Sequence, residues 1–146
     1  MGQQGSARDF DFWVGEWDVF GPLGRQVGSN TISLLFDGGA IAEHWRGNGG
    51  VEGHSLNAFD PARGRWHQTW VDSTGGLLLL DGGLVNGAMV LGGSAPGESG
   101  DPERQRITWS REEGGVRQHW ETSADDGATW ATAFDGHYRP STSLGG

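Results

Sequence analysis

The chain has 146 residues, of which 28 are glycine and 8 are tryptophan, and its 19 acidic and 10 basic side chains give a formal net charge of −9. This length suits a single domain, and so much glycine argues against an all-helical fold because each interior glycine costs a helix about 1 kcal/mol. The acidic balance argues against nucleic acid and anionic membranes, which are bound through clustered Lys and Arg, so we expect neither as a partner.

Ten runs of alternating apolar and polar residues follow one another along the chain, separated by turn signals. In chain order these predicted strands span residues 12–20, 26–36, 41–47, 52–60, 65–72, 77–81, 84–92, 106–112, 116–123 and 130–138. The turns include residues 37–39, 60–64, 81–83 and 113–115, whose glycines supply the positive φ that tight hairpins need. Because the connections are short, we predict an all-β, antiparallel up-and-down meander that closes into a barrel of about eight to ten strands. A two-sheet sandwich is the alternative.

The predicted domain is a single barrel over residues 9–139, with 1–8 and 140–146 as flexible tails of small, polar and glycine residues. The chain has no cysteine, and no apolar run approaches the roughly 20 residues that span a bilayer. Residues 1–8 lack the cationic start and apolar core of a signal peptide. We therefore expect a cytoplasmic location.

Period-two alternation gathers tryptophan and polar side chains on one face of the predicted sheet. Trp130, Thr132 and Phe134 are expected to share a face as well. Unpaired polar groups on an inner wall cost about 1–3 kcal/mol each, so we expect a cavity that holds a ligand or water. The alternative is that these groups bond one another across the barrel. The candidate ligand-binding residues are Glu43, Trp45, Asn57, Trp66, Gln68, Trp70, Trp109, Gln118 and Trp120.

Glu43 is the best catalytic candidate, with Asp72 and His54 as conceivable partners. A carboxylate in an apolar pocket has a raised pKa and can act as a general base near neutrality. The same group can instead hold the polar end of a bound molecule, so the residues leave open whether the protein is an enzyme.

Metal and cofactor chemistry have little support in the sequence. Of the five histidines only His54 is a candidate for the inner face, where the inward residue of its run is either Asn57 or His54. No HxH or HxxxH spacing occurs, so we expect no metal site and no cofactor. Residues 123–130 match the pattern S-x-D-x-G-x-T-W, the Asp-box of sialidase-type propellers. Propellers repeat this element and here it occurs once, so it predicts a stable β-turn rather than glycosidase activity.

Several motifs together carry a resemblance to a known family. The first predicted strand contains Gly15-x-Trp17, and the chain continues with Ser55-x-Asn57, with RWxQxWVD at 65–72 and with FDGxYR at 134–139. Over residues 9–139 it resembles calycin-type barrels, the lipocalins and their relatives, and in particular the uncharacterised bacterial DUF1579-type proteins. The resemblance implies structural roles for Gly15 and Trp17, with Trp17 closing the barrel base and stacking against Arg139 as a cation–π pair. Nitrobindin-like haem barrels also begin with G-x-W, but the late strand here lacks their haem-ligating histidine.

Three hypotheses follow for the function. The first is a calycin-like barrel that binds a small, mostly apolar or aromatic molecule, stacked on indoles and oriented by Glu43, Asn57, Gln68 and Gln118. The second is a cofactor-independent enzyme that performs isomerisation, cyclisation or hydrolysis in the same cavity with Glu43 as base. The third is a scaffold or oligomerising module with a solid tryptophan core, and a homodimer is left open.

Overall fold

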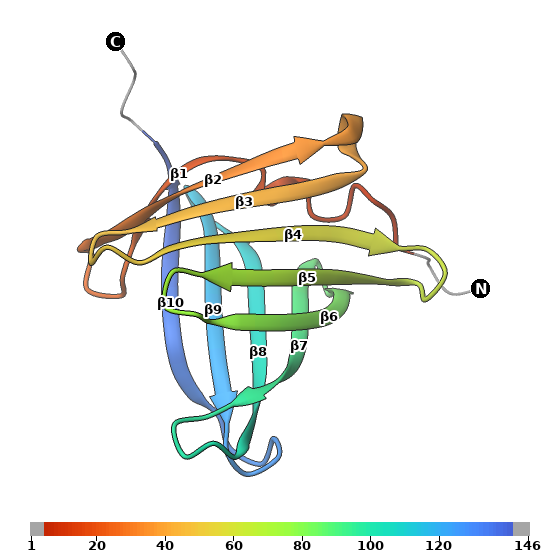
Figure 1. The fold of residues 1–146 in the computed structure, drawn as a ribbon. Helices are drawn as coiled ribbons and strands as arrows, with labels where there is room; N and C mark the ends of the chain where they lie inside the picture. Colours follow the sequence, from red (N-terminus) through yellow and green to blue (C-terminus); the bar gives the residue numbers. More distant parts are fainter. Residues whose placement is uncertain (1–4, 142–146) are drawn as a thin grey trace.

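The computed structural model describes residues 5–141 as ten antiparallel strands in a meander, with β10 paired to β1 so that the barrel closes (Figure 1). The strands are β1 (Gly15–Phe20), β2 (Gln26–Leu35), β3 (Ala40–Gly47), β4 (Glu52–Asp60), β5 (Arg65–Asp72), β6 (Leu77–Val85), β7 (Ala88–Pro96), β8 (Pro102–Glu112), β9 (Gly115–Ser123) and β10 (Ala131–Pro140). Two short 3-10 helices, η1 (Asp11–Trp13) and η2 (Phe36–Gly38), complete the elements. The predicted all-β closed barrel is therefore confirmed, at the upper end of the expected strand number.

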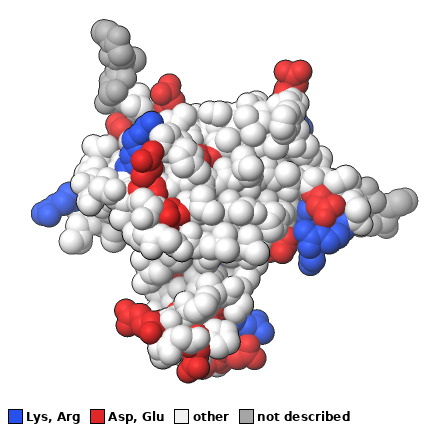
Figure 2. Space-filling model, in the orientation of Figure 1, with Lys and Arg blue, Asp and Glu red and all other residues white. Residues whose placement is uncertain are grey.

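The barrel is flattened into two crossing layers. In Figure 1, β2 to β6 run across the view, whereas β7 to β10 run down it behind them. Buried hydrophobic side chains form the interior of the barrel. Acidic side chains gather at the lower end of the molecule (Figure 2).

One hairpin turn lies elsewhere than the sequence predicted. The β6–β7 turn is Asn86–Gly87, with φ of 52° and 83°, and not residues 81–83. Two consecutive positive φ angles suit the primed turn of a two-residue hairpin, which Asn-Gly adopts readily. Gly82 stays inside β6, where a Cβ would lie 1.9 Å from the Val90 carbonyl oxygen. That glycine permits close packing of strands and does not mark a turn.

The N-terminal segment closes one end of the barrel with aromatic rings. Phe10 stacks on Trp13 at 4.7 Å between ring centroids and meets the edges of Trp66 and Trp109 at 5.7 and 5.1 Å. All four side chains are fully buried or within 1% of it. We call these four residues the aromatic plug.

The expected stacking of Trp17 against Arg139 is wrong. Trp17 faces inward, where its indole donates a 2.8 Å hydrogen bond to the Trp13 carbonyl oxygen. Arg139 follows the inward-facing Tyr138, so the alternation of β10 turns it outward, and its guanidinium bonds Glu112 at 2.9 Å. A different arginine lies over an aromatic ring of the N-terminal segment, because the Arg111 guanidinium sits 4.7 Å from the centroid of Phe12.

Gly15 begins β1 two residues before the inward-facing Trp17. A Cβ at Gly15 would lie 3.3 Å from the Trp17 indole, which is closer than ordinary van der Waals contact. A side chain at this position would therefore press against the Trp17 indole.

The Asp-box segment forms the β9–β10 turn. Asp125 accepts hydrogen bonds from the Thr129 amide at 2.8 Å and the Ser123 hydroxyl at 2.7 Å, and Gly127 has φ of 93°. These hydrogen bonds, led by that of the Thr129 hydroxyl, lower the pKa of Asp125 to about 2. The turn interpretation of this motif agrees with the observed geometry.

Trp130 does not share a face with Phe134 as expected. A β-bulge between Thr132 and Phe134 shifts the register of β10 against β9. Thr132 consequently bonds His119 on the outer face, while Phe134 points inward. Trp130 lies outside β10, with the Arg106 guanidinium 4.0 Å from its ring centroid.

Parts of the predicted tails are held by hydrogen bonds. The Ser6 amide donates to the Asp9 carboxylate at 2.8 Å, and the Ser141 amide donates to the Glu16 carbonyl oxygen at 2.9 Å. The rest of the predicted tails, residues 1–4 and 142–146, lies outside the described residues. From residue 5 to residue 141, no helix is both long enough and apolar enough to cross a membrane.

Candidate functional site

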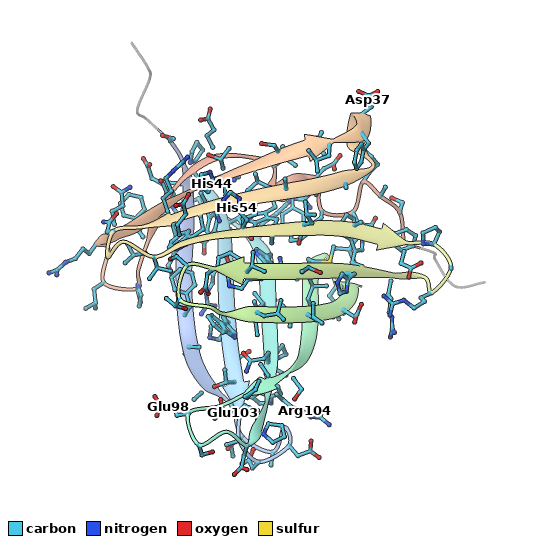
Figure 3. All side chains as sticks on the ribbon, viewed as in Figure 1. Asp37, His44, His54, Glu98, Glu103 and Arg104 are labelled. Carbon is cyan, nitrogen blue, oxygen red and sulfur yellow. The ribbon has the colours of Figure 1, made fainter. Side chains whose placement is uncertain are left out.

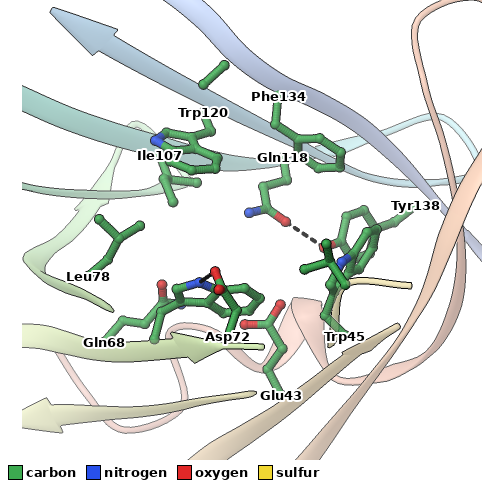
Figure 4. Close-up of a pocket in the computed structure, with 13 residues that line it drawn as sticks. Glu43, Trp45, Gln68, Asp72, Leu78, Ile107, Gln118, Trp120, Phe134 and Tyr138 are labelled. Atoms are coloured by element: carbon green, nitrogen blue, oxygen red, sulfur yellow. Dashed lines mark hydrogen bonds between the residues drawn. The ribbon is translucent and has the colours of Figure 1, made fainter. Parts of the chain in front are cut away.

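The interior holds a cavity of about 230 Å³ at the end away from the aromatic plug (Figure 4). Along β5 the inward side chains change from the plug at Trp66 to the cavity at Gln68 and Trp70, and along β8 they change from Trp109 to Ile107. The lining residues are Glu43, Trp45, Val51, Gln68, Trp70, Asp72, Leu78, Ile107, Gln118, Trp120, Ala133, Phe134 and Tyr138. We call this cavity the pocket.

Glycines on the strands make room for three of the pocket's aromatic rings. The pairs are Trp45 with Gly28, Trp70 with Gly53, and Phe134 with Gly136. A Cβ at Gly53 would lie 2.2 Å from the Trp70 ring, and the corresponding distance is 2.6 Å in the other two pairs. Each ring therefore packs closely against the backbone at a position where a Cβ would collide with it.

Glu43 lies at the bottom of the pocket and is 5% exposed. Its carboxyl group accepts a 2.6 Å hydrogen bond from the Ser55 hydroxyl on one oxygen and a 2.8 Å bond from the Asn30 amide on the other. The two donors come from the neighbouring strands β4 and β2, so the carboxyl group is held from both sides.

These bonds continue in both directions as a chain of buried hydrogen bonds, which we call the polar belt. On one side the Gln68 amide donates to Asn57 at 2.7 Å, and Asn57 donates to Ser55 at 2.9 Å. On the other side Asn30 donates to the Tyr138 hydroxyl at 2.9 Å, and that hydroxyl donates to Gln118 at 2.5 Å (Figure 4). Polar side chains bond one another across the barrel as the second sequence alternative proposed, yet the pocket remains above them.

Burial controls the protonation of the belt. Loss of solvent raises the pKa of Glu43 above 4.5, and the hydrogen bonds from Ser55 and Asn30 offset this only in part. Burial, helped by the nearby Glu43 charge, also raises the pKa of Tyr138 well above 10. Tyr138 thus stays a hydrogen-bond donor. Glu43 accepts both of its hydrogen bonds from the belt, so a proton on its carboxyl group has no acceptor within the belt.

Asp72 lines the rim of the pocket but is occupied by its own turn. Its carboxylate accepts hydrogen bonds from the amides of Thr74 and Gly76 at 2.9 and 3.0 Å and from the Trp70 indole at 2.9 Å. Burial raises the pKa of Asp72, but these hydrogen bonds together outweigh burial and lower it. Asp72 therefore fixes the orientation of Trp70 and stays ionised.

Of the two alternatives for the inward polar residue of β4, Asn57 points inward and His54 does not, so His54 is no partner of Glu43. Ser55 and Asn57 take the inward positions of β4, so alternation turns His54 outward, where its side chain is 59% exposed. Its ring stacks on that of His44. The three catalytic candidates are consequently not brought together, and Glu43 is the one at the bottom of the pocket.

Six of the nine candidate ligand-binding residues line the pocket, namely Glu43, Trp45, Gln68, Trp70, Gln118 and Trp120. Asn57 lies one step behind Gln68 in the polar belt, and Trp66 and Trp109 belong to the aromatic plug. Sequence reasoning missed the lining residues Phe134 and Tyr138. Their period-two spacing around Gly136 is the signal that could have found them.

Among the described residues, one group of side chains is arranged to hold a metal ion, and it lies on the outer face of the barrel. It consists of His44, Glu52 and His54. HxH and HxxxH spacing does not reveal this group, because its two histidines lie on different, paired strands.

The ten-stranded antiparallel barrel is consistent with a calycin-like fold. No family model matches the chain, and no curated protein matches it.

Proposed function

We propose that the barrel binds a small, mostly apolar or aromatic molecule in the pocket. The observation that carries this proposal is the pocket's lining, in which five aromatic rings surround a floor of buried polar groups. Aromatic walls with a few fixed polar groups are typical of small-molecule sites. At about 230 Å³ the pocket lies below the usual range of about 300–1,000 Å³, so the ligand is small.

The charges around the pocket favour a ligand without an acidic group. The described lining residues include two carboxyl groups, those of Glu43 and Asp72, and no Lys, Arg or His. A ligand carboxylate would lose its hydration without gaining a cationic partner, which is unfavourable. A neutral aromatic molecule meets no such penalty.

Two amides are able to orient that molecule. The Gln68 side-chain oxygen and the Gln118 side-chain nitrogen take no part in the bonds of the polar belt, and both residues line the pocket. They offer one acceptor and one donor beside Glu43. A ligand with one or two polar atoms on an aromatic frame suits this arrangement.

Calorimetric titration with 2-naphthol and 2-naphthoate tests this proposal. The wild-type protein should bind the neutral compound at least 10-fold more tightly than the carboxylate. Ile107→Phe should weaken 2-naphthol binding at least 10-fold by filling the pocket, whereas Thr108→Phe adds the same ring at the next, outward position of β8. Equal binding in the two variants, or no binding of 2-naphthol or of any other neutral bicyclic aromatic in a panel, would refute the proposal.

The second candidate is an enzyme that uses Glu43 for acid–base chemistry, such as isomerisation, cyclisation or hydrolysis. The raised pKa of Glu43 and its position in the lining of the pocket support this candidate. Glu43→Gln should then abolish turnover of a bound molecule while leaving its binding within a few fold. Unchanged turnover would remove Glu43 as the base.

We also propose membership in the DUF1579-type proteins on the motifs that carry the resemblance. The motif residues Ser55, Asn57, Gln68 and Tyr138 all belong to the polar belt, and Trp70 lines the pocket. The motif residues thus lie in the interior, where related proteins are expected to share side chains. The cytoplasmic location and a homodimer stay predictions.

A further inference from the structure

Three side chains converge on the outer face of β3 and β4. The His44 Nε2 atom lies 2.5 Å from a Glu52 carboxylate oxygen, and the His54 Nε2 atom lies 4.0 Å from the same oxygen. The two imidazole rings stack at 4.2 Å between centroids (Figure 3). One ligand atom from each residue lies within 4.8 Å of the other two.

The hairpin register creates this arrangement. β3 and β4 pair so that His44 stands directly opposite His54, and Glu52 lies two residues before His54 on the same face. Arg46 is paired with Glu52 and is the neighbouring cation, while Val71 on β5 is paired with His54. The ligand atoms are thus carried by two hydrogen-bonded strands and do not depend on a mobile loop.

We propose that His44, Glu52 and His54 form a binding site for a divalent transition-metal ion such as Zn²⁺. Two imidazole nitrogens and one carboxylate oxygen are a common protein ligand set for zinc, with further positions left for water or another ligand. Ca²⁺ and Mg²⁺ prefer all-oxygen surroundings, so they do not suit this set.

Closing the three groups around a metal needs only side-chain movement. Two ligand atoms about 2.1 Å from a tetrahedral zinc are about 3.4 Å apart. The His44 and Glu52 atoms, 2.5 Å apart, therefore have to separate by about 0.9 Å, and the His54 and Glu52 atoms, 4.0 Å apart, have to approach by about 0.6 Å. The stacked rings must also turn so that both Nε2 atoms face one point. The side chains of Glu52 and His54 are more than half exposed, which leaves them room to rotate.

The metal site is independent of the pocket. Successive residues of β3 point to opposite faces, so Glu43 faces the pocket and His44 faces solvent. Substitutions at the metal site therefore leave the polar belt and the aromatic lining unchanged. Either proposal can fail without the other.

Zinc titration of the chelator-stripped full chain, in competition with a chromophoric zinc indicator, tests the site. One equivalent of Zn²⁺ should bind, and His44→Gln, Glu52→Gln and His54→Gln should each weaken it roughly 10-fold or more. His67→Gln and His119→Gln are the matched controls, because each removes an outward histidine that belongs to no group of three possible ligands among the described residues. His67 lies beside Asp81, and His119 lies beside Glu121 and opposite Asp135. These controls should bind zinc like the wild type.

A second readout locates the ion. The imidazole NMR signals of His44 and His54 should shift on addition of one equivalent of Zn²⁺, and those of His67 and His119 should not. The proposal is overturned if the wild type binds no zinc, if His54→Gln and Glu52→Gln bind it unchanged, or if the two controls weaken it equally.

Discussion

Replacing Glu43 by Gln tests the polar belt most sharply, because the two side chains have nearly the same shape. The Glu43 carboxyl group accepts hydrogen bonds of 2.6 and 2.8 Å from Ser55 and Asn30. The Gln amide can accept only one of these, and its NH₂ group faces the other donor. A buried donor left without an acceptor costs about 1–3 kcal/mol, so Glu43→Gln should lower the free energy of unfolding by that amount at pH 4.

The cost should depend on pH in a defined direction. Burial raises the pKa of Glu43 in the folded protein above its ordinary value of 4.5, so the folded state keeps this proton at pH values where the unfolded chain has lost it. The associated stability is fully present below pH 4.5 and is lost as the pH rises through the folded pKa, at up to about 1.4 kcal/mol per pH unit. Gln does not titrate. The stability advantage of the wild type over the variant should therefore shrink as the pH increases from 4.

Urea unfolding followed by circular dichroism between pH 4 and pH 8 measures this difference. Glu112→Gln is the control of opposite sign. Burial raises the pKa of Glu112, but hydrogen bonds from His137 and Arg139 outweigh burial and lower it. Stability from Glu112 is thus present above pH 4.5 and lost as the pH falls. The stability advantage of the wild type over Glu112→Gln should therefore grow with pH. A wild-type advantage over Glu43→Gln that is constant or grows with pH would refute the assigned burial of Glu43.

Three further predictions concern packing and the Asp-box turn. Gly53→Ala should destabilise the fold by about 1–3 kcal/mol and weaken ligand binding, because its Cβ would lie 2.2 Å from Trp70. The control is Gly49→Ala, which has open space at its Cβ and should change neither the midpoint of urea unfolding nor the affinity for 2-naphthol. Trp109→Ala should cost about 3–5 kcal/mol in urea unfolding, because this fully packed indole belongs to the aromatic plug. Asp125 has a pKa of about 2 against 3.8 in the unfolded chain, so its stabilisation is present above pH 3.8 and is lost towards pH 2. In acid titration the difference between the wild type and Asp125→Asn should close over that interval.

The alternation of apolar and polar residues predicted the strands and most of the inward face. It placed Glu43, Trp45 and Gln68 on the interior because side-chain direction in a strand depends only on position within the run. It could not separate Trp66 and Trp109 from the pocket, since depth along the barrel depends on which end the N-terminal segment closes.

Two further differences from the sequence predictions come from a β-bulge that interrupts a strand and from a strand pairing that brings distant residues together. The β-bulge after Thr132 reverses the face expected for Trp130, and no local pattern marks that extra residue. The metal cluster depends on the pairing of His44 with His54, which follows from the register of the β3–β4 hairpin. Pairing the two predicted strands residue by residue across their turn would have placed His44 opposite His54.

Indole N–H signals in a ¹H–¹⁵N NMR titration with 2-naphthol test the proposed binding most directly. Trp45, Trp70 and Trp120 line the pocket, whereas Trp13, Trp66 and Trp109 are packed in the aromatic plug. Binding in the pocket predicts saturable shifts for the first three signals and little change in the other three. Unmoved pocket signals at saturating ligand, or shifts confined to the plug, would contradict it.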